Sequence, residues 1–149
     1  MCLRIAIERP DRVLAKGEHL GFQWIVTHNS QGYRCGYVRV PAGHPWHGKH
    51  YHDDGFYVDV HGGCTFAEAD VNCDKGGEDN AWWFGFDCAH GFDAPDLSLP
   101  VSPEWQAVAD LRAKFSSFEL GEARSQAYVE NECRSLCEQA AAVTLEKAS

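Results

Sequence analysis

The chain has no long apolar run. No stretch approaches the ~18 apolar residues that a membrane-spanning helix needs, although 44% of the 149 residues are apolar. Charged side chains interrupt the N-terminal region, which therefore lacks the apolar core of a secretory signal. They are Arg4, Glu8, Arg9, Asp11 and Arg12. We therefore expect a cytoplasmic protein that makes no contact with a membrane.

Basic residues are scarce. The chain has 13 lysines and arginines against 22 aspartates and glutamates, a formal net charge of −9 at pH 7. An acidic chain without a basic stripe repels phosphate backbones, so we expect no direct binding to duplex nucleic acid. A small anionic ligand stays compatible with this charge, because local donors outweigh net charge at contact distance. The acidic surface is typical of a solubility device, and it also suits docking onto a basic nucleic-acid-binding protein.

Paired cysteine motifs are also absent. The chain has 7 cysteines, an odd number, and no Cys-x-x-Cys spacing, which favours free thiols over a disulfide framework or a zinc site. Cys133 and Cys137 lie one helical turn apart and are interpreted as core residues. A histidine near Cys88 can activate a thiolate, yet nothing marks an oxyanion hole, so a buried unreactive cysteine is favoured over a nucleophile.

The pattern of apolar residues along the chain changes once, near Leu97 to Pro103. Before that point, alternating apolar residues predict a β-hairpin over 20–40 with its turn at 29–32 and a third strand over 56–60. The run over 82–86 is apolar on both faces, which predicts a central strand that is covered on each side. The first part of the chain is therefore expected to be rich in β-structure.

Helical signals follow. Ser102, Pro103 and Glu104 resemble a helix start, and an apolar stripe from Val129 to Val143 predicts a final helix. We predict one α+β domain over residues 1–149, β-rich over 1–97 and helical over 103–146. Its mainly antiparallel sheet of about four strands carries two C-terminal helices packed on one face.

Histidines gather in the middle of the chain. Imidazole and carboxylate groups ligate zinc, manganese and iron, so a divalent metal site is one hypothesis. The segment from 43 to 52 is loop-like and holds no His-Glu-x-x-His helix, so we assign no metal ligand and expect several of these histidines to be solvated. The clustered histidines are His44, His47, His50, His52 and His61.

His61 stands at a strand-like end directly before Gly62 and Gly63, and the Thr65 hydroxyl follows. Glycines allow tight turns and close backbone approach to a ligand. This pattern predicts a small anion pocket with backbone N–H donors. The alternative is an ordinary bend with a surface histidine.

Asp87 and His90 follow the most apolar strand, and Asp93 follows the turn at Gly91. A carboxylate at the end of a buried strand is costly unless it is paired. Asp87 is therefore either a structural hydrogen-bond hub or a functional acid, and His90 can pair with Asp93 or Asp87 as an oriented general base. Because His61 and Asp87 both stand at strand ends, we predict that His61, Asp87 and His90 converge in space.

Aromatic residues flank the same region. Most of them must lie in the core, and one or two at a pocket rim would suit a nucleotide-sized ligand. They are Trp46, Tyr51, Tyr57, Trp82 and Trp83.

Four segments carry a resemblance to a known group of proteins: GYVRVP at 36–41, GHP at 43–45, VHGGCTF at 60–66 and WFGFDCAH at 83–90. The chain resembles uncharacterised small proteins of bacteriophages and bacterial mobile elements, mainly over 30–95. This resemblance implies a phage or prophage accessory role in the host-cell cytoplasm. The motif positions to which it points are His44, His61, Asp87, His90 and Asp93.

Three function hypotheses result. The first is a binding protein that holds a small, nucleotide-like ligand and counteracts host defence signalling by sequestering a messenger. The second is a metal-dependent or His/Asp-assisted phosphoester hydrolase, with a divalent metal as the open cofactor alternative. The third is an acidic inhibitor of a host defence protein, such as a CRISPR-type effector. The predicted ligand-binding residues are His44, His61, Gly62, Gly63, Thr65, Trp83, Asp87, His90 and Asp93.

Overall fold

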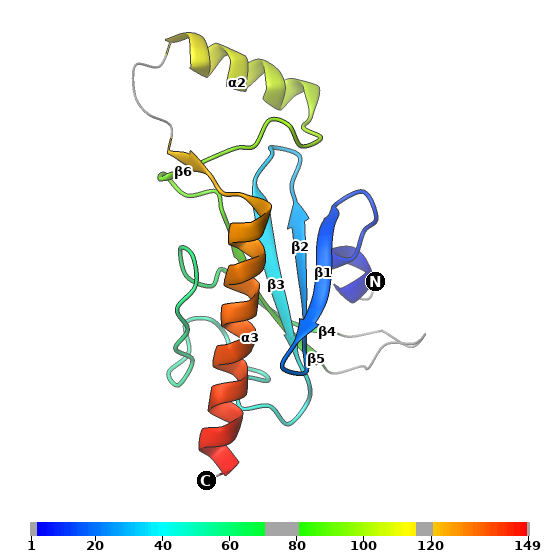
Figure 1. Ribbon diagram of the computed structural model, residues 1–149, viewed down its shortest axis with the longest axis vertical. Helices are drawn as coiled ribbons and strands as arrows, with labels where there is room; N and C mark the ends of the chain where they lie inside the picture. Colours follow the sequence, from blue (N-terminus) through cyan, green and yellow to red (C-terminus); the bar gives the residue numbers. More distant parts are fainter. Residues whose placement is uncertain (1–2, 71–80, 116–120, 149) are drawn as a thin grey trace.

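A five-stranded antiparallel sheet forms the centre of the protein (Figure 1). The structure is a computed structural model and describes residues 3–70, 81–115 and 121–148. The strand order is β1-β2-β3-β5-β4. The strands are β1 Val13–His19, β2 Phe22–His28, β3 Arg34–Val40, β4 Phe66–Asp70 and β5 Ala81–Asp87. The predicted α+β class and its mainly antiparallel sheet are confirmed.

The predicted hairpin corresponds to β2 and β3, which pair from Gln23 opposite Arg39 to His28 opposite Arg34. The Asn29 side chain closes their turn by accepting hydrogen bonds from the backbone N–H groups of Gln31 and Tyr33, at 2.9 and 3.2 Å. The predicted strand over 82–86 is β5, which lies between β3 and β4. The sequence pattern did not predict β1 or β4.

In the described part of the chain, three helices accompany the sheet: α1 Leu3–Ile7, α2 Pro103–Phe115 and α3 Gln126–Ala148. The long α3 crosses one face of the sheet along β1, β2 and β3, and α2 lies beyond one end of the sheet (Figure 1). Ser102 caps α2 by accepting a hydrogen bond from the backbone N–H of Trp105 at 3.2 Å. The start of α2 at Pro103 is the predicted one, and α3 contains the apolar stripe predicted from Val129 to Val143. Among the described residues, no helix combines the length and apolar content needed to cross a membrane.

The main core lies between the sheet and α3. One stripe of α3 is fully buried against β2 and β3, as its apolar periodicity predicts. The buried residues of this stripe are Val129, Cys133, Leu136, Cys137 and Ala140. The opposite face of the sheet carries a smaller cluster of Ile7, Ile25 and Trp83. Alternation along β5 thus sends Trp83 away from α3.

The predicted third strand over 56–60 is wrong, because these residues belong to no strand. Phe56 and Val60 are nevertheless buried, and the Phe56 ring stacks on Phe84 with ring centroids 4.4 Å apart. The Gln139 side chain of α3 accepts a hydrogen bond from the Asp59 N–H and donates one to the Asp59 carbonyl, each at 2.8 Å. A side-chain amide therefore replaces the strand partner that the alternating pattern implied.

The five cysteines in the described part of the chain are free, and Cys2 and Cys73 lie outside the described residues. Burial raises the pKa of Cys35, Cys64 and Cys88 to about 12. We therefore expect these thiols to react with an alkylating reagent at pH 8 at least about tenfold more slowly in the native protein than in denaturant. Peptide mass mapping after a short alkylation pulse measures this, and rapid labelling of Cys88 would revive the nucleophile hypothesis.

Candidate functional site

A short parallel strand pair places the site at one end of the sheet. After β5 the chain turns into β6 Asp93–Ala94, which pairs with β7 Glu122–Ala123 just before α3. The turn is closed by the Asp93 N–H, which donates to the His90 carbonyl at 2.9 Å. This pairing brings Asp93 beside Arg124 and the first turn of α3.

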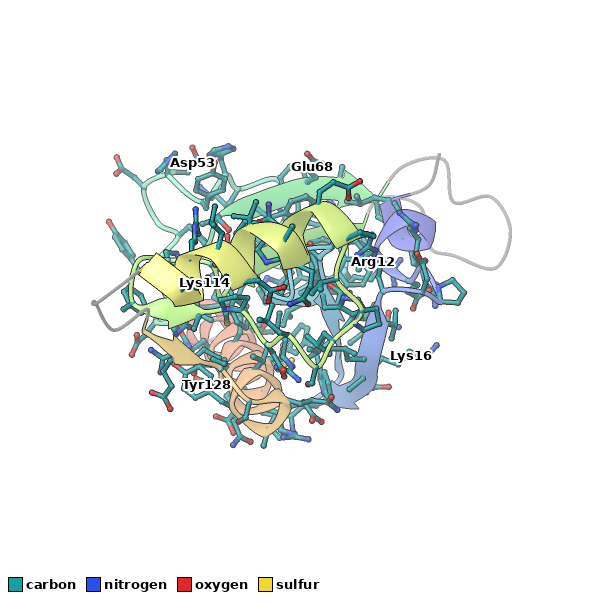
Figure 2. All side chains as sticks on the ribbon, turned by 90° about the horizontal axis from the view of Figure 1, so that it is seen from above. Arg12, Lys16, Asp53, Glu68, Lys114 and Tyr128 are labelled. Atoms are coloured by element: carbon teal, nitrogen blue, oxygen red, sulfur yellow. The ribbon has the colours of Figure 1, made fainter. Side chains whose placement is uncertain are left out.

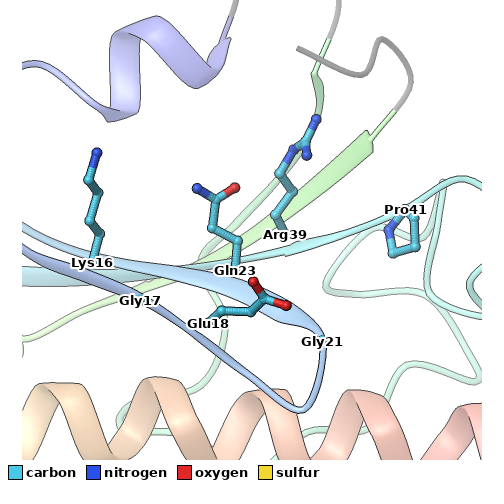
Figure 3. Close-up of a pocket in the computed structure, with 7 residues that line it drawn as sticks. All are labelled: Lys16, Gly17, Glu18, Gly21, Gln23, Arg39 and Pro41. Carbon is cyan, nitrogen blue, oxygen red and sulfur yellow. The ribbon is translucent and has the colours of Figure 1, made fainter. Parts of the chain in front are cut away.

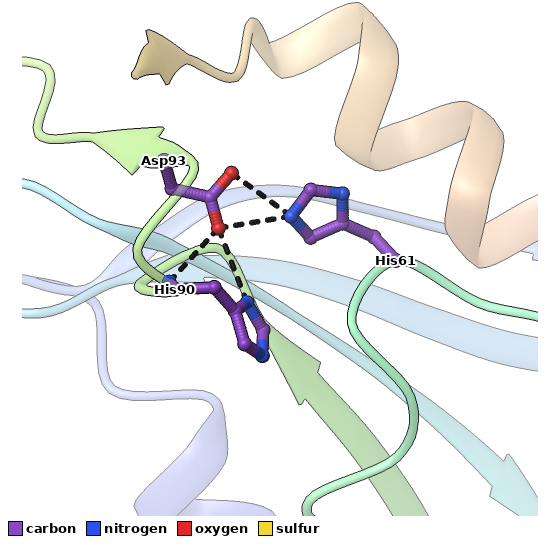
Figure 4. A group of neighbouring side chains, drawn as sticks. All are labelled: His61, His90 and Asp93. Atoms are coloured by element: carbon purple, nitrogen blue, oxygen red, sulfur yellow. Dashed lines mark hydrogen bonds and ion pairs between the residues drawn. The ribbon is translucent and has the colours of Figure 1, made fainter. Parts of the chain in front are cut away.

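His61 reaches the same point from the loop that precedes β4. Its backbone N–H donates to Glu132 Oε1 of α3 at 2.9 Å. Its ring is buried, and Nε2 lies 2.9 Å from both Asp93 carboxylate oxygens (Figure 4). A carboxylate only accepts hydrogen bonds, so the neutral ring carries its proton on Nε2, and Nδ1 accepts from the Tyr128 hydroxyl at 2.8 Å.

Asp93 is the centre of this network. Its side chain is fully buried, and it accepts hydrogen bonds from the rings of His61 and His90, the His90 backbone N–H and Arg124 Nε. Burial alone would raise the Asp93 pKa, but these hydrogen bonds outweigh it and hold the pKa at about 2. Asp93 is therefore a carboxylate anion at neutral pH, with the Arg124 guanidinium 2.9 Å away as its countercharge.

His90 is held in one orientation. Its Nδ1 lies 3.1 Å from Asp93 Oδ2, and its ring is parallel to the Phe92 ring at 5.2 Å between centroids. A Cβ on Gly62 would lie 2.1 Å from His90 Cε1, and Gly62 has a φ of +67°, so only glycine fits there. With Nδ1 donating to Asp93, the Nε2 lone pair is available, and no described residue hydrogen-bonds to it.

Asp87 and Thr65 form the rim of the site. The Thr65 hydroxyl donates to Asp87 Oδ2 at 3.1 Å, and Asp87 Oδ1 accepts from the Ala89 N–H at the same distance. Asp87 Oδ1 also lies 3.9 Å from His90 Nδ1. The rings of His61 and His90 are 5.6 Å apart. The predicted convergence of His61, Asp87 and His90 is confirmed as a matter of geometry.

Two predicted ligand-binding residues lie elsewhere. The buried His44 bonds through Nε2 to the Ala140 carbonyl at 2.9 Å and accepts from the Trp46 N–H through Nδ1 at 3.0 Å. It therefore anchors its loop to α3. Trp83 is buried in the cluster on the opposite face of the sheet. Gly63 stands beside Gly62, with a φ of +82° and open space at its Cβ position.

Sequence reasoning did not identify Arg124, Tyr128 or Glu132 as site residues. Arg124 precedes α3, and the two others are one turn apart near its start. They reach the site because α3 lies across the sheet with its N-terminal end beside β6 (Figure 1). No local motif marks them, since their partners His61 and Asp93 are separated from them by 31 residues or more.

A pocket of about 360 Å³ lies beside the network, between the turn that carries His90 and the helix α2. Tyr33 and Trp105 supply aromatic rings to its wall, with centroids 6.3 Å apart. Arg112 also lines it, with Cζ 5.3 Å from the Trp105 ring centroid. Figure 2 looks down on this end of the molecule, where α2 crosses in front of the sheet.

A larger pocket of about 680 Å³ lies near the other ends of β1, β2 and β3 (Figure 3). Lys16, Gln23 and Arg39 point into it from the strands. Arg39 Nε is 3.2 Å from the buried Asp70 carboxylate, which neutralises its charge. None of the predicted site residues lines this pocket, so it is the weaker candidate.

Comparisons with known proteins add no relative. No family model, no curated protein and no solved structure matches the chain. The function must therefore be inferred from the residues of the site itself.

Proposed function

We propose that the protein binds a small ligand with an aromatic ring and an anionic group, in the manner of a nucleotide, in the pocket beside α2. One observation carries this proposal: aromatic rings, an arginine and the oriented His90 line the same cavity of about 360 Å³. Pockets for small molecules have volumes of about 300–1,000 Å³ and combine apolar walls with a few placed polar groups.

Each part of the pocket suits one part of such a ligand. Trp105 and Tyr33 offer faces for stacking of a base. Arg112 forms no ion pair with any described residue, so its guanidinium can pair with a phosphate. His90 offers the Nε2 lone pair to a hydroxyl or amino group, while the buried Asp93 keeps its ring fixed.

The biological role follows from the resemblance to proteins of bacteriophages and mobile elements. In that setting the ligand is a host nucleotide messenger, and binding it withholds it from a defence effector. Such a sponge releases the ligand unchanged when it is denatured. Mass spectrometry of small molecules released from the purified native protein therefore identifies the ligand and tests the role.

Replacing Trp105 by alanine should weaken nucleotide binding at least about tenfold, because stacking of a base on an aromatic side chain contributes ~1–3 kcal/mol. Trp105→Phe should retain most of the affinity. Tyr57→Ala is the matched control, since Tyr57 is a 79% exposed aromatic residue outside the pocket. Calorimetric titration with a panel of mono-, di- and cyclic nucleotides measures the effect.

Unchanged binding by Trp105→Ala would place the ligand elsewhere on the protein. A chain that carries no nucleotide after purification and binds none from the panel would contradict the proposal. If such a chain captured a host protein, the acidic inhibitor hypothesis would replace it.

Phosphoester hydrolysis is the second candidate function, and the geometry of His90 favours it. A carboxylate that fixes one imidazole nitrogen while the other stays available is the arrangement of a general base. A hydrolase would release product with turnover, and His90→Gln would abolish turnover. A sponge would return the intact ligand.

A further inference from the structure

Three side-chain atoms in the buried network have the chemistry and the spacing of metal ligands. They are the ring nitrogens of His61 and His90 that face Asp93, and an oxygen of the Asp93 carboxylate (Figure 4). All three lie within 4.8 Å of one another. His61 Nε2 and His90 Nδ1 are 2.9 and 3.1 Å from Asp93 Oδ2.

We propose that His61, His90 and Asp93 bind a divalent transition-metal ion such as Zn²⁺. Zinc binds histidine nitrogens and carboxylate oxygens at about 2.0–2.2 Å, which places neighbouring ligands of a tetrahedral site roughly 3.3–3.6 Å apart. The two His–Asp spacings are a few tenths of an ångström shorter than this range, so these atoms must move apart by about that much to admit an ion.

The surroundings support the three ligands as they do in known metal sites. A ligating histidine commonly bonds through its second ring nitrogen, which fixes the ring. His61 does so with the Tyr128 hydroxyl at 2.8 Å, and Arg124 holds the second Asp93 oxygen at 2.9 Å. Gly62 and Phe92 pack against the His90 ring and so restrict its movement.

Besides these small shifts, metal binding needs a change of tautomer in the histidines. When the ion takes the lone pair of His61 Nε2, the proton moves to Nδ1, which then donates to the Tyr128 oxygen. His90 binds the ion through Nδ1 and carries its proton on Nε2. Asp93 binds the ion through one carboxylate oxygen. Arg124 stays on the other carboxylate oxygen, so the ion meets an anionic ligand.

The site also has room for a further ligand. His90 and Asp93 line the pocket of about 360 Å³ beside α2, so water or a bound molecule can occupy a fourth position. Three protein ligands with one open position define the catalytic type of zinc site, whereas structural sites have four protein ligands. The metal proposal stands apart from the proposed nucleotide-like ligand, although both use this end of the pocket. With the ion bound, His90 Nε2 carries a proton, so it would donate a hydrogen bond to the ligand instead of accepting one.

Metal titration of chelator-treated protein tests the site. We expect Zn²⁺ to bind with one-to-one stoichiometry and to raise the melting temperature by about 5 °C or more at saturation. Co²⁺ should give the visible absorption bands of a tetrahedral complex. His90→Ala should weaken Zn²⁺ binding at least about 100-fold, because loss of supporting groups alone costs about 10–100-fold. Tyr128→Phe should weaken it by a smaller factor.

His50→Ala is the matched control, because His50 is an exposed histidine outside the network. His90 is only partly buried, so its alanine variant should keep the fold, and circular dichroism verifies this. Zn²⁺ binding that survives His90→Ala, or that is lost in His50→Ala, would overturn the proposal. The absence of both Co²⁺ bands and Zn²⁺ heat would also overturn it.

The two proposals fail separately in these experiments. Trp105 contributes no metal ligand, so Trp105→Ala should bind Zn²⁺ normally. Nucleotide binding that persists after chelation would support the ligand pocket without the metal. Zn²⁺ binding by a chain that binds no nucleotide would support the metal site alone.

Discussion

Asp93→Asn is expected to lower the free energy of unfolding by about 3–5 kcal/mol, the usual cost of breaking a buried charge network by removing one partner. The Asp93 side chain is fully buried and accepts from two histidines, one arginine and one backbone N–H. An asparagine has one acceptor oxygen, and its NH₂ group would face donors. Arg124 would also lose its countercharge.

Urea unfolding of the wild-type protein and of the Asp93→Asn variant measures this loss. Asp54→Asn is the matched control, because Asp54 is exposed and should change stability by less than about 0.5 kcal/mol. A loss below about 1 kcal/mol in Asp93→Asn would show that the network contributes little to folding.

The same carboxylate gives stability a defined pH dependence in the metal-free protein. The Asp93 pKa falls from 3.8 to about 2 on folding, so its contribution is complete above the unfolded value and is lost as pH falls through the folded one. This linkage amounts to about 2 kcal/mol. The difference in unfolding free energy between the wild-type protein and the Asp93→Asn variant should therefore shrink between about pH 4 and pH 2.

Gly62→Ala is expected to cost about 2–5 kcal/mol of stability, whereas Gly63→Ala should cost only about 1–2 kcal/mol. Both glycines have left-handed backbone conformations, with φ values of +67° and +82°. Only at Gly62 would the new Cβ collide with His90, at 2.1 Å from Cε1, because the Cβ position of Gly63 is open. The difference between the variants therefore isolates the contact with His90.

Chemical unfolding measures both costs, and imidazole NMR spectra report whether His90 keeps its hydrogen bond to Asp93. We expect that hydrogen bond to be lost in Gly62→Ala and retained in Gly63→Ala. Equal costs and intact spectra in both variants would mean that the His90 ring moves freely, which would weaken both site proposals.

Most elements that the sequence predicted share one property: their apolar residues repeat with the period of the structure they form. This holds for β2, β3 and the buried stripe of α3, whereas β5 was predicted from a run that is apolar on both faces. The edge strand β1 was missed because Lys16, Gly17 and Glu18 interrupt its apolar residues. The segment 56–60 has the apolar alternation of a strand, but its backbone hydrogen-bonds to the Gln139 side chain instead of to a neighbouring strand.

The candidate site was predictable only in part. His61, Asp87, His90 and Asp93 could be selected because they follow apolar runs and stand near glycines. The pairing of His61 with Asp93 depends on how the turn after β5 meets the loop before β4, which no local pattern encodes. Arg124 and Tyr128 contact Asp93 and His61 because of where α3 lies on the sheet. Trp105 lines the pocket because of where α2 lies.

The residues that meet at Asp93 lie far apart in the sequence, and this affects the order in which contacts form during folding. Neighbouring strands such as β1, β2 and β3 join through short turns and close at little entropic cost. The contacts of His61 with Asp93 and Tyr128 span 32 and 67 residues. Contacts of high sequence separation form slowly, so the hairpins of β1, β2 and β3 should form before the His61 contacts. A folding chain should therefore hold these hairpins before it holds the site.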